Sequence, residues 1–264
     1  MMPQDLLIFN HIPKTAGTSL KQIITEQYGS ENCFLCYGGV FGNQTIADRV
    51  EELNKQLVYE DNQGKKNKTI KAVIGHVGYG LHDLLPDRQF THITFLRNPV
   101  ERVISYYYDL NRQGRVGTPT GNQSRYIIEC IETKFLIEAD NWQTRYLSGR
   151  GWQHIILKGK GERIGFGQCT TELLEQAKKE LKENYLFGIQ DRFIESINFF
   201  TKKLDWQPAS QNIKLNSAQK NQNKKHISAE AIECIKKLNW LDMELYEYAK
   251  GILEEQINNK NLVA

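Results

Sequence analysis

The sequence has no run of about 18 apolar residues, the length that a membrane-spanning helix requires. Its first residues, Met1-Met-Pro-Gln-Asp5, lack the basic head of a signal peptide. It also lacks a Gly/Pro/Ser-rich hinge between two comparably hydrophobic halves, so we expect one domain over residues 1–264. The absence of a long apolar run and of a signal-peptide head predicts a cytoplasmic protein without a transmembrane segment.

Neither sign of charge is in large excess. The chain has 34 Lys and Arg residues against 31 Asp and Glu residues, a formal net charge of +3. A general nucleic-acid-binding protein has a much larger basic excess, so we expect no nucleic-acid partner. A local site for an anionic ligand is compatible with this balance.

Cysteine is scarce, and the five cysteines are scattered along the chain. This pattern is not that of a disulfide framework, which favours a reducing compartment. The pair in Cys33-Phe-Leu-Cys36 has the spacing of half a zinc site. No second Cys/His pair follows at a ligand-like distance, so we predict no metal site.

Three continuous apolar runs predict strands that are covered on both faces of a parallel sheet. They are Leu6-Leu-Ile-Phe9, Ala72-Val-Ile-Gly-His-Val77 and His92-Ile-Thr-Phe-Leu96. The first is followed by a loop and then by apolar residues at helical spacing, namely Leu20, Ile23, Ile24 and Tyr28. The order strand, loop, helix is therefore expected at the start of the chain.

A helix is also predicted after the third run. Asn98 can cap it, Pro99 suits the first helical position, and Glu101 stands where a capping box has its acid. One face of this helix is apolar and consists of Val100, Val103, Ile104, Tyr107 and Leu110.

Further helices are expected at about 124–136, 141–148, 171–184, 191–203 and 228–255, with a short strand at Tyr185-Leu-Phe-Gly-Ile189. Strands that alternate with helices predict a doubly wound α/β fold with a mainly parallel sheet and a helical C-terminal part. The stretches 60–69, 113–124 and 205–226 are predicted loops, and long loops on such a sheet often cover ligands.

The segment Asn10-His-Ile-Pro-Lys-Thr-Ala-Gly-Thr-Ser-Leu20 indicates a phosphate-binding loop between a buried strand and a helix. Backbone N–H groups at a helix start bind anions, Gly17 permits close approach, and the hydroxyls of Thr15, Thr18 and Ser19 can donate hydrogen bonds. It is not a Walker A loop, because Lys14 precedes the glycine. The alternative interpretation is an ordinary turn with an N-cap.

Two further positions favour a ligand site at the same edge of the sheet. Arg97 follows a buried strand, where open α/β sheets bind ligands, and Ser105 lies two helical turns later, away from the apolar stripe. Together they can hold a second phosphate; alternatively, they are a surface arginine and a solvated serine. His76 ends another buried strand and can act as a general base, although a lone histidine can also be structural. His11 is the other histidine that we retain, because it lies inside the phosphate loop.

These motifs resemble those of sulfotransferases that use 3′-phosphoadenosine 5′-phosphosulfate (PAPS). Pro13-Lys-Thr-Ala-Gly-Thr-Ser19 resembles their 5′-phosphosulfate loop, and Leu96-Arg-Asn-Pro-Val-Glu-Arg-Val-Ile-Ser-Tyr-Tyr-Tyr108 resembles their 3′-phosphate segment. Gly75-His-Val77 resembles the segment with the catalytic histidine of the carbohydrate branch, which includes heparan sulfate 2-O-sulfotransferases. The similarity extends through 141–149 and 187–193. It implies a P-loop-like sulfotransferase fold.

The resemblance also implies roles for single residues. His76 would deprotonate the acceptor, and Lys14 would stabilise the leaving oxygen of the phosphosulfate. The 5′-phosphosulfate would be bound by Pro13, Lys14, Thr15, Ala16, Gly17, Thr18 and Ser19, and the 3′-phosphate by Arg97 and Ser105. Asn216 and Lys220, in the loop expected over the nucleotide, are further candidates for donor binding. The product would be 3′,5′-diphosphoadenosine (PAP).

The acceptor is expected to be a carbohydrate or another molecule with a hydroxyl group. Where this sequence has His11, the animal glycan enzymes carry an arginine near their acidic substrate. This departure favours a less anionic glycan, a glycolipid or a smaller molecule as the acceptor. The chain also lacks the membrane anchor of the Golgi enzymes, which favours a bacterial-type cytoplasmic enzyme. His11, Trp142 and Arg145 are the candidate acceptor-binding residues.

Two other functions remain open at this point. A nucleotide kinase or phosphotransferase would use the same loop on ATP, but it needs Mg²⁺, and the sequence has no clustered carboxylates placed to hold that ion. A non-catalytic PAP- or glycan-binding module would keep the loop without turnover. The presence of both Lys14 and His76 favours the enzyme, which on this reading needs no metal.

Overall fold

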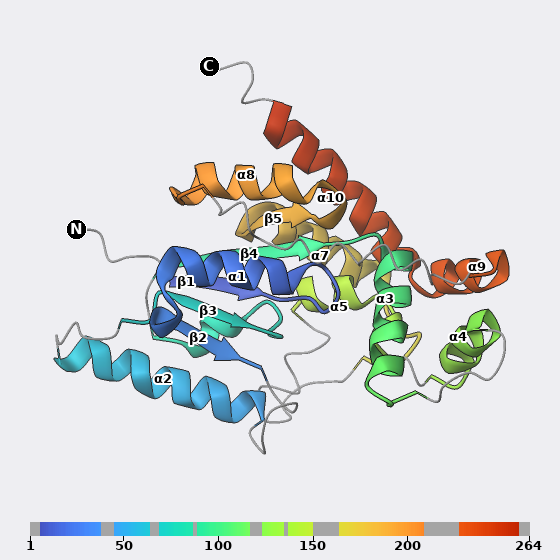
Figure 1. The fold of residues 1–264 in the computed structure, drawn as a ribbon, viewed down its shortest axis with the longest axis horizontal. Helices are drawn as coiled ribbons and strands as arrows, with labels where there is room; N and C mark the ends of the chain where they lie inside the picture. The colour runs from blue at the N-terminus through green and yellow to red at the C-terminus, as the bar shows by residue number, and fades with distance from the viewer. Residues whose placement is uncertain are drawn as a thin grey trace.

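The computed structural model describes residues 6–37, 45–63, 69–86, 89–116, 123–134, 137–149, 164–208 and 227–258. Within these ranges, five strands form one parallel sheet in the order β2-β3-β1-β4-β5. The strands are β1 (Leu6–Asn10), β2 (Cys33–Cys36), β3 (Ala72–Gly75), β4 (Phe90–Leu96) and β5 (Tyr185–Ile189). Helices stand on both faces of the sheet (Figure 1), which confirms the predicted doubly wound α/β fold.

The α-helices of the described residues are α1 (Gly17–Tyr28), α2 (Ile46–Gln63), α3 (Pro99–Arg112), α4 (Gln123–Glu132), α5 (Trp142–Leu147), α7 (Thr171–Asn184), α8 (Phe193–Leu204), α9 (Ala229–Leu238) and α10 (Trp240–Asn258). The C-terminal part is helical, as predicted. The helix expected at 228–255 is two helices, which meet at Asn239. None of the helices in the described ranges combines the length and the apolar character that crossing a bilayer requires.

The three predicted apolar runs form β1, β3 and β4, and β1 pairs with both of the others. β5 has the predicted bounds, whereas β2 was not predicted. In β2, Cys33 and Cys36 are three positions apart and therefore point to opposite faces of the sheet. Cys33 packs against the same cluster as α1, and Cys36 lies in the cluster with α2. The pair consequently does not converge on one point.

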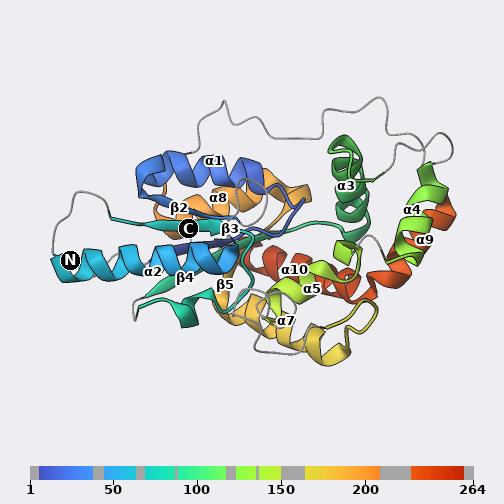
Figure 2. The same cartoon turned by 90° about the horizontal axis from the view of Figure 1, so that it is seen from below.

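Different helices cover the two faces of the sheet. Leu7 and Phe9 of β1 belong to the apolar cluster that contains Leu20 of α1. Leu6 and Ile8 belong instead to the cluster that contains residues of α2. Because side chains alternate along a strand, α1 and α2 lie on opposite faces. Figure 2 shows α1 and α8 on one side of the sheet, with α2 and α7 on the other.

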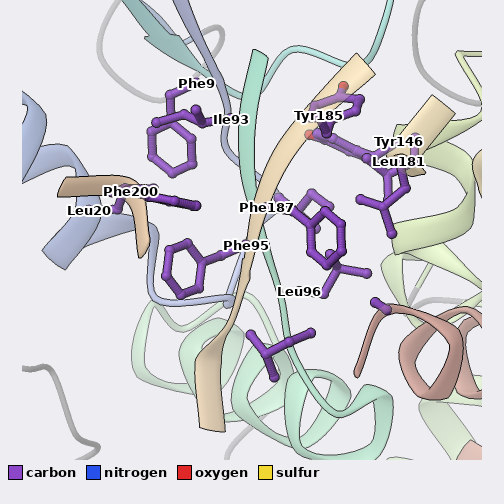
Figure 3. Packing of buried hydrophobic residues seen from close by; sticks show 14 of the residues in the cluster. Phe9, Leu20, Ile93, Phe95, Leu96, Tyr146, Leu181, Tyr185, Phe187 and Phe200 are labelled. Carbon is purple, nitrogen blue, oxygen red and sulfur yellow. The ribbon is translucent and has the colours of Figure 1, made fainter. Parts of the chain in front are cut away.

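The core around β4 and β5 follows the same two-sided arrangement. In Figure 3, Phe95 lies beside Phe200 of α8 on one side of the strands, while Phe187 and Leu181 of α7 lie on the other. The ring centroids of Phe95 and Phe200 are 5.5 Å apart, and the two rings meet edge to face. Burying one such side chain contributes about 1.5–3 kcal/mol. Both helical layers therefore hold the strands, and with them the strand ends, in place.

Helices α3, α4 and α9 pack together beyond the carboxyl ends of the strands (Figure 1). The apolar stripe predicted for α3 is buried in this group. The Asn98 side chain caps α3 by accepting hydrogen bonds from the N–H groups of Val100 (3.1 Å) and Glu101 (3.2 Å). Pro99 occupies the first turn, as predicted. This cap fixes the point at which the chain turns from β4 into α3, directly after Arg97.

Candidate active site

The loop between β1 and α1 has a strained backbone. Lys14 and Ala16 adopt the left-handed region, with φ of 72° and 71°. Non-glycine residues rarely do so, and such strain concentrates at ligand-binding sites. The Ala16 carbonyl accepts the N–H groups of Ser19 (3.1 Å) and Leu20 (3.2 Å), which closes the first turn of α1. A strand, a loop and a helix N-terminus in this order are an arrangement that can bind an anion through backbone N–H groups.

The three hydroxyl groups of the loop have different surroundings. Thr15 is fully buried, and its hydroxyl donates to the carbonyl of Ile12 (2.8 Å). Its single hydroxyl proton is thus used inside the loop, and any contact with a phosphate would come from its backbone. Ser19 is also buried, whereas Thr18 is exposed. Of the three, Thr18 is the one whose side chain reaches the surface at the start of α1.

Gly17 is required by a neighbouring ring as well as by its place in the loop. A Cβ atom on Gly17 would lie 1.8 Å from Nε2 of His11. The His11 ring is stacked on Phe9, with centroids 5.3 Å apart. Its Nδ1 shares a hydrogen bond of 2.9 Å with the hydroxyl of Tyr37. The absence of a side chain at position 17 therefore lets His11 pack against the phosphate loop.

His11, Tyr37 and His76 form a compact cluster at the ends of β1, β2 and β3. The centroid of the His76 ring lies 4.7 Å from the centroid of the His11 ring and 4.8 Å from that of the Tyr37 ring. The pairing of Asn10 with Gly75 brings the two histidines together, and the His11 N–H donates to the Gly75 carbonyl (2.8 Å). The sheet is parallel, so His76 does lie beside the phosphate loop. Tyr37 was not predicted, although it follows a strand end as the histidines do.

Both histidines are held neutral. Burial lowers the pKa of His76 to about 4. Burial also lowers the pKa of His11 well below its ordinary value, and the nearby His76, Lys21 and Lys14 lower it further. A neutral imidazole has a free nitrogen lone pair at physiological pH. The cluster can therefore accept a proton but does not supply a positive charge.

Asn10 anchors the segment that carries His76. Its side-chain amide donates to the carbonyls of Val77 and Gly78, both at 3.0 Å. Its Oδ1 shares a hydrogen bond of 3.0 Å with Nδ1 of His92. Because the amide oxygen can only accept, His92 donates, which fixes the orientation of the amide. This role could not be predicted from the sequence, since it depends on contacts between residues more than 60 positions apart.

Lys14 faces an acidic residue on α3. Its Nζ lies 3.1 Å from Oδ2 of Asp109, and each side chain is about a quarter exposed. Burial alone would raise the pKa of Asp109, but hydrogen bonding to Arg112 and the charge of Lys14 lower it below its ordinary value. Lys14, in the phosphate loop, is therefore paired with the carboxylate of Asp109, and an anionic ligand can take the place of that carboxylate. Asp109 was not predicted as part of the site.

Arg97 joins the phosphate loop to α3. Its guanidinium donates to the Lys14 carbonyl (3.2 Å) and pairs with Glu101 at 3.4 Å. Its backbone is bound by the side chain of Gln143. Ser105, on α3, is half-buried. The structure thus brings Arg97 to the loop that contains Lys14, as the sequence predicted.

Two of the candidate acceptor-binding residues lie inside the protein. Trp142 and Arg145 are 5% and 4% exposed. The Arg145 guanidinium pairs with Asp140 and donates to the carbonyls of Ile164 and Gly165, both at 2.8 Å. Every residue of α5 is buried, so these two side chains pack inside the protein and do not reach its surface. Asn216 and Lys220 lie outside the described residues.

The chain is similar to known sulfotransferases. A model described as the sulfotransferase family matches residues 1–249. Homo sapiens heparan-sulfate 6-O-sulfotransferase 2 is 26% identical over 279 residues, which cover 94% of this chain and 44% of that protein. Its Gallus gallus counterpart is 28% identical over 281 residues, covering 94% of this chain and 66% of that protein. The chain therefore spans less than half the length of the human relative.

A solved structure of a mouse sulfotransferase complexed with PAP aligns with a TM-score of 0.42 at 14% identity, covering 80% of this chain and 62% of that chain. The curated relatives are named for 6-O-sulfation. A resemblance to heparan sulfate sulfotransferases is therefore found, but with the 6-O rather than the 2-O enzymes. The motifs behind the resemblance were assigned to the donor and the base, so they carry no information on which hydroxyl is sulfated.

Proposed function

Because the chain belongs to the sulfotransferase family, we propose that it transfers a sulfuryl group from PAPS to a hydroxyl group of a carbohydrate acceptor. The observation that carries this proposal is one arrangement at the carboxyl ends of β1 and β3. There, a strained phosphate loop that contains Lys14 lies beside His76, which is half-buried and neutral. An anion site next to a proton acceptor is what this reaction requires.

In the proposed reaction, the acceptor oxygen attacks sulfur in line with the bond to the leaving phosphate oxygen. A new S–O bond forms, the S–O bond to the nucleotide breaks, and PAP leaves. His76 takes the hydroxyl proton. Lys14 and the N–H groups of the loop stabilise the negative charge that develops on the departing oxygen. The phosphosulfate would replace Asp109 as the partner of Lys14, since both are anions.

The remaining assigned residues follow from their positions. The 5′-phosphate would contact the backbone from Pro13 to Ser19 and the exposed hydroxyl of Thr18. Arg97 and Ser105 would bind the 3′-phosphate. His11 is neutral in the free protein, so it does not supply the positive charge that an arginine would bring to an acidic acceptor. The cytoplasmic location stays a prediction from the sequence.

The first test is thermal stabilisation by PAP without metal. A ligand present at 100 times its dissociation constant stabilises the folded state by about 2.7 kcal/mol. For a protein of this size that raises the melting temperature by about 5–10 °C. We expect this shift with PAP alone, measured by differential scanning fluorimetry. A shift that requires ATP and Mg²⁺ would instead support phosphoryl transfer, and PAP binding without turnover of PAPS would support the non-catalytic module.

The pH dependence of turnover tests the state of His76. Since the neutral imidazole is the active form, kcat/KM for PAPS should fall as the pH drops through about 4, the lowered pKa of His76 in the free protein. The negative charge of bound phosphosulfate favours the imidazolium ion, so kcat should fall at a higher pH. Circular dichroism at each pH separates this effect from unfolding. A decline of kcat/KM near the ordinary histidine pKa of about 6.5 would contradict the lowered pKa of His76.

A further inference from the structure

The backbone of Arg97 is bound by a single side chain, that of Gln143 on α5. The Arg97 N–H donates to Oε1 of Gln143 (2.9 Å), and Nε2 of Gln143 donates to the Arg97 carbonyl (3.0 Å). Gln143 is fully buried. Arg97 is the first residue after β4, where the pairing of the sheet has ended. The glutamine amide therefore binds the backbone N–H and carbonyl of Arg97 in the way that a neighbouring strand would.

Gln143 is itself fixed by the C-terminal helix. The N–H groups of Gln143 and Thr144 donate to the two carboxylate oxygens of Asp242 on α10, at 3.0 and 2.7 Å. In return, Oδ1 of Asn141 accepts the N–H groups of Leu241 (3.0 Å) and Asp242 (3.2 Å) at the start of α10. Asp242 of α10 thus caps the start of α5, and Asn141, directly before α5, caps the start of α10.

This reciprocal cap is buried. Asn141 and Asp242 are 3% and 0% exposed. Burial raises the pKa of Asp242 above its ordinary value, and the charge of the fully buried Arg102 opposes this rise. A buried side chain that satisfies two backbone N–H groups has little freedom to move, because an alternative position would leave them without partners. The orientation of Gln143 relative to β4 is therefore set by contacts far from the phosphate loop.

The position of the Arg97 backbone determines where its guanidinium meets the loop. That guanidinium donates to the carbonyl of Lys14, whose left-handed conformation shapes the anion site. A shift of about 1 Å in such a group is enough to weaken a charge-assisted hydrogen bond. The contacts thus run from Asp242 through Gln143 to Arg97 and the phosphate loop.

We propose that Gln143 is a positioning residue for recognition of the donor's 3′-phosphate, acting through Arg97. The inference rests on the proposed function, in which Arg97 binds that phosphate. Gln143 does not touch the donor. It holds the backbone of the residue that does, and α10 holds Gln143.

The test compares two ligands that differ by the 3′-phosphate, PAP and adenosine 5′-monophosphate, by isothermal titration calorimetry. In Gln143→Met, which keeps the length of the side chain but removes both hydrogen bonds, we expect the Kd for PAP to rise about tenfold. The Kd for adenosine 5′-monophosphate should change less than about twofold. The matched control is Gln176→Met on α7, a half-buried glutamine away from the loop, which should change neither value.

A double-mutant cycle separates positioning from a general structural effect. In an Arg97→Ala background, Gln143→Met should raise the Kd for PAP by less than about twofold, because the group that Gln143 positions is already gone. An equal loss for both ligands, or additive losses in the cycle, would overturn the inference. If Gln143→Met does not fold, Gln143→Glu keeps the acceptor for the Arg97 N–H and should show a smaller loss that is again selective for PAP. A wild-type protein that binds neither ligand would overturn the proposed function itself.

Discussion

His76→Ala is expected to lower kcat by about 10²–10⁴, the range for loss of a general base, while the Kd for PAP changes less than about twofold. The reason is the position of the ring. His76 lies against His11 and Tyr37 at the end of β3, on the side of the loop away from Arg97's contact with α3. Removing it takes away the proton acceptor without removing a group assigned to the nucleotide. Steady-state rates with PAPS and PAP titrations measure the two effects separately.

His82→Ala is the matched control for this variant. His82 is also half-buried and packed among aromatic rings, but it lies in the short helix Leu81–Leu84 and contacts Tyr79 and His92. It should leave kcat within about twofold. Unchanged turnover in His76→Ala would remove His76 from the proton transfer and direct attention to His11, 4.7 Å away. A parallel loss of PAP affinity would point to a structural role.

Lys14→Ala should lower kcat by about 10²–10³, the cost of losing one group that stabilises developing charge. It should also weaken PAPS binding, but by less, because the charge on the departing oxygen is greater in the transition state than in the bound donor. The protein should stay folded. Asp109 keeps its pairing with Arg112 after Lys14 is removed, so no buried charge loses its last partner.

Measured kcat values and melting temperatures of Lys14→Ala and Lys55→Ala test this expectation. Lys55 is an exposed lysine on α2 that pairs with Glu51, away from the phosphate loop, and its removal should affect neither quantity. Lys14→Arg keeps the charge on a longer, planar group and should recover part of the activity. Full activity in Lys14→Ala would contradict charge stabilisation by this residue.

Much of the fold could be read from local patterns. The continuous apolar runs of β1, β3 and β4, the cap at Asn98 and the apolar stripe of α3 depend on neighbouring residues alone, and all are found as predicted. β2 was missed although Cys33-Phe-Leu-Cys36 is a continuous apolar run, because the spacing of its two cysteines was interpreted only as half a metal site. α2 was also missed, although Val50, Leu53 and Leu57 repeat at helical spacing and are buried.

The candidate site could be predicted only in part. That the phosphate loop, His76 and Arg97 lie near one another could be predicted because each follows a strand, and the ends of parallel strands meet at one edge. Tyr37, Asp109 and Gln143 were not found, since their roles depend on contacts across 26, 95 and 46 positions. Arg145 was misjudged because a residue type does not reveal whether its side chain is buried.

The sequence by itself determined which elements form and which chemical groups stand at their ends, since capping, apolar periodicity and loop composition act over a few residues. Only the tertiary structure decided the state of those groups. Burial made His11 and His76 neutral, pairing placed Lys14 against Asp109, and the contact of α5 with α10 fixed the glutamine that holds Arg97. Desolvation and hydrogen-bond pairing depend on everything that surrounds an atom, and those surroundings are brought together from distant parts of the chain.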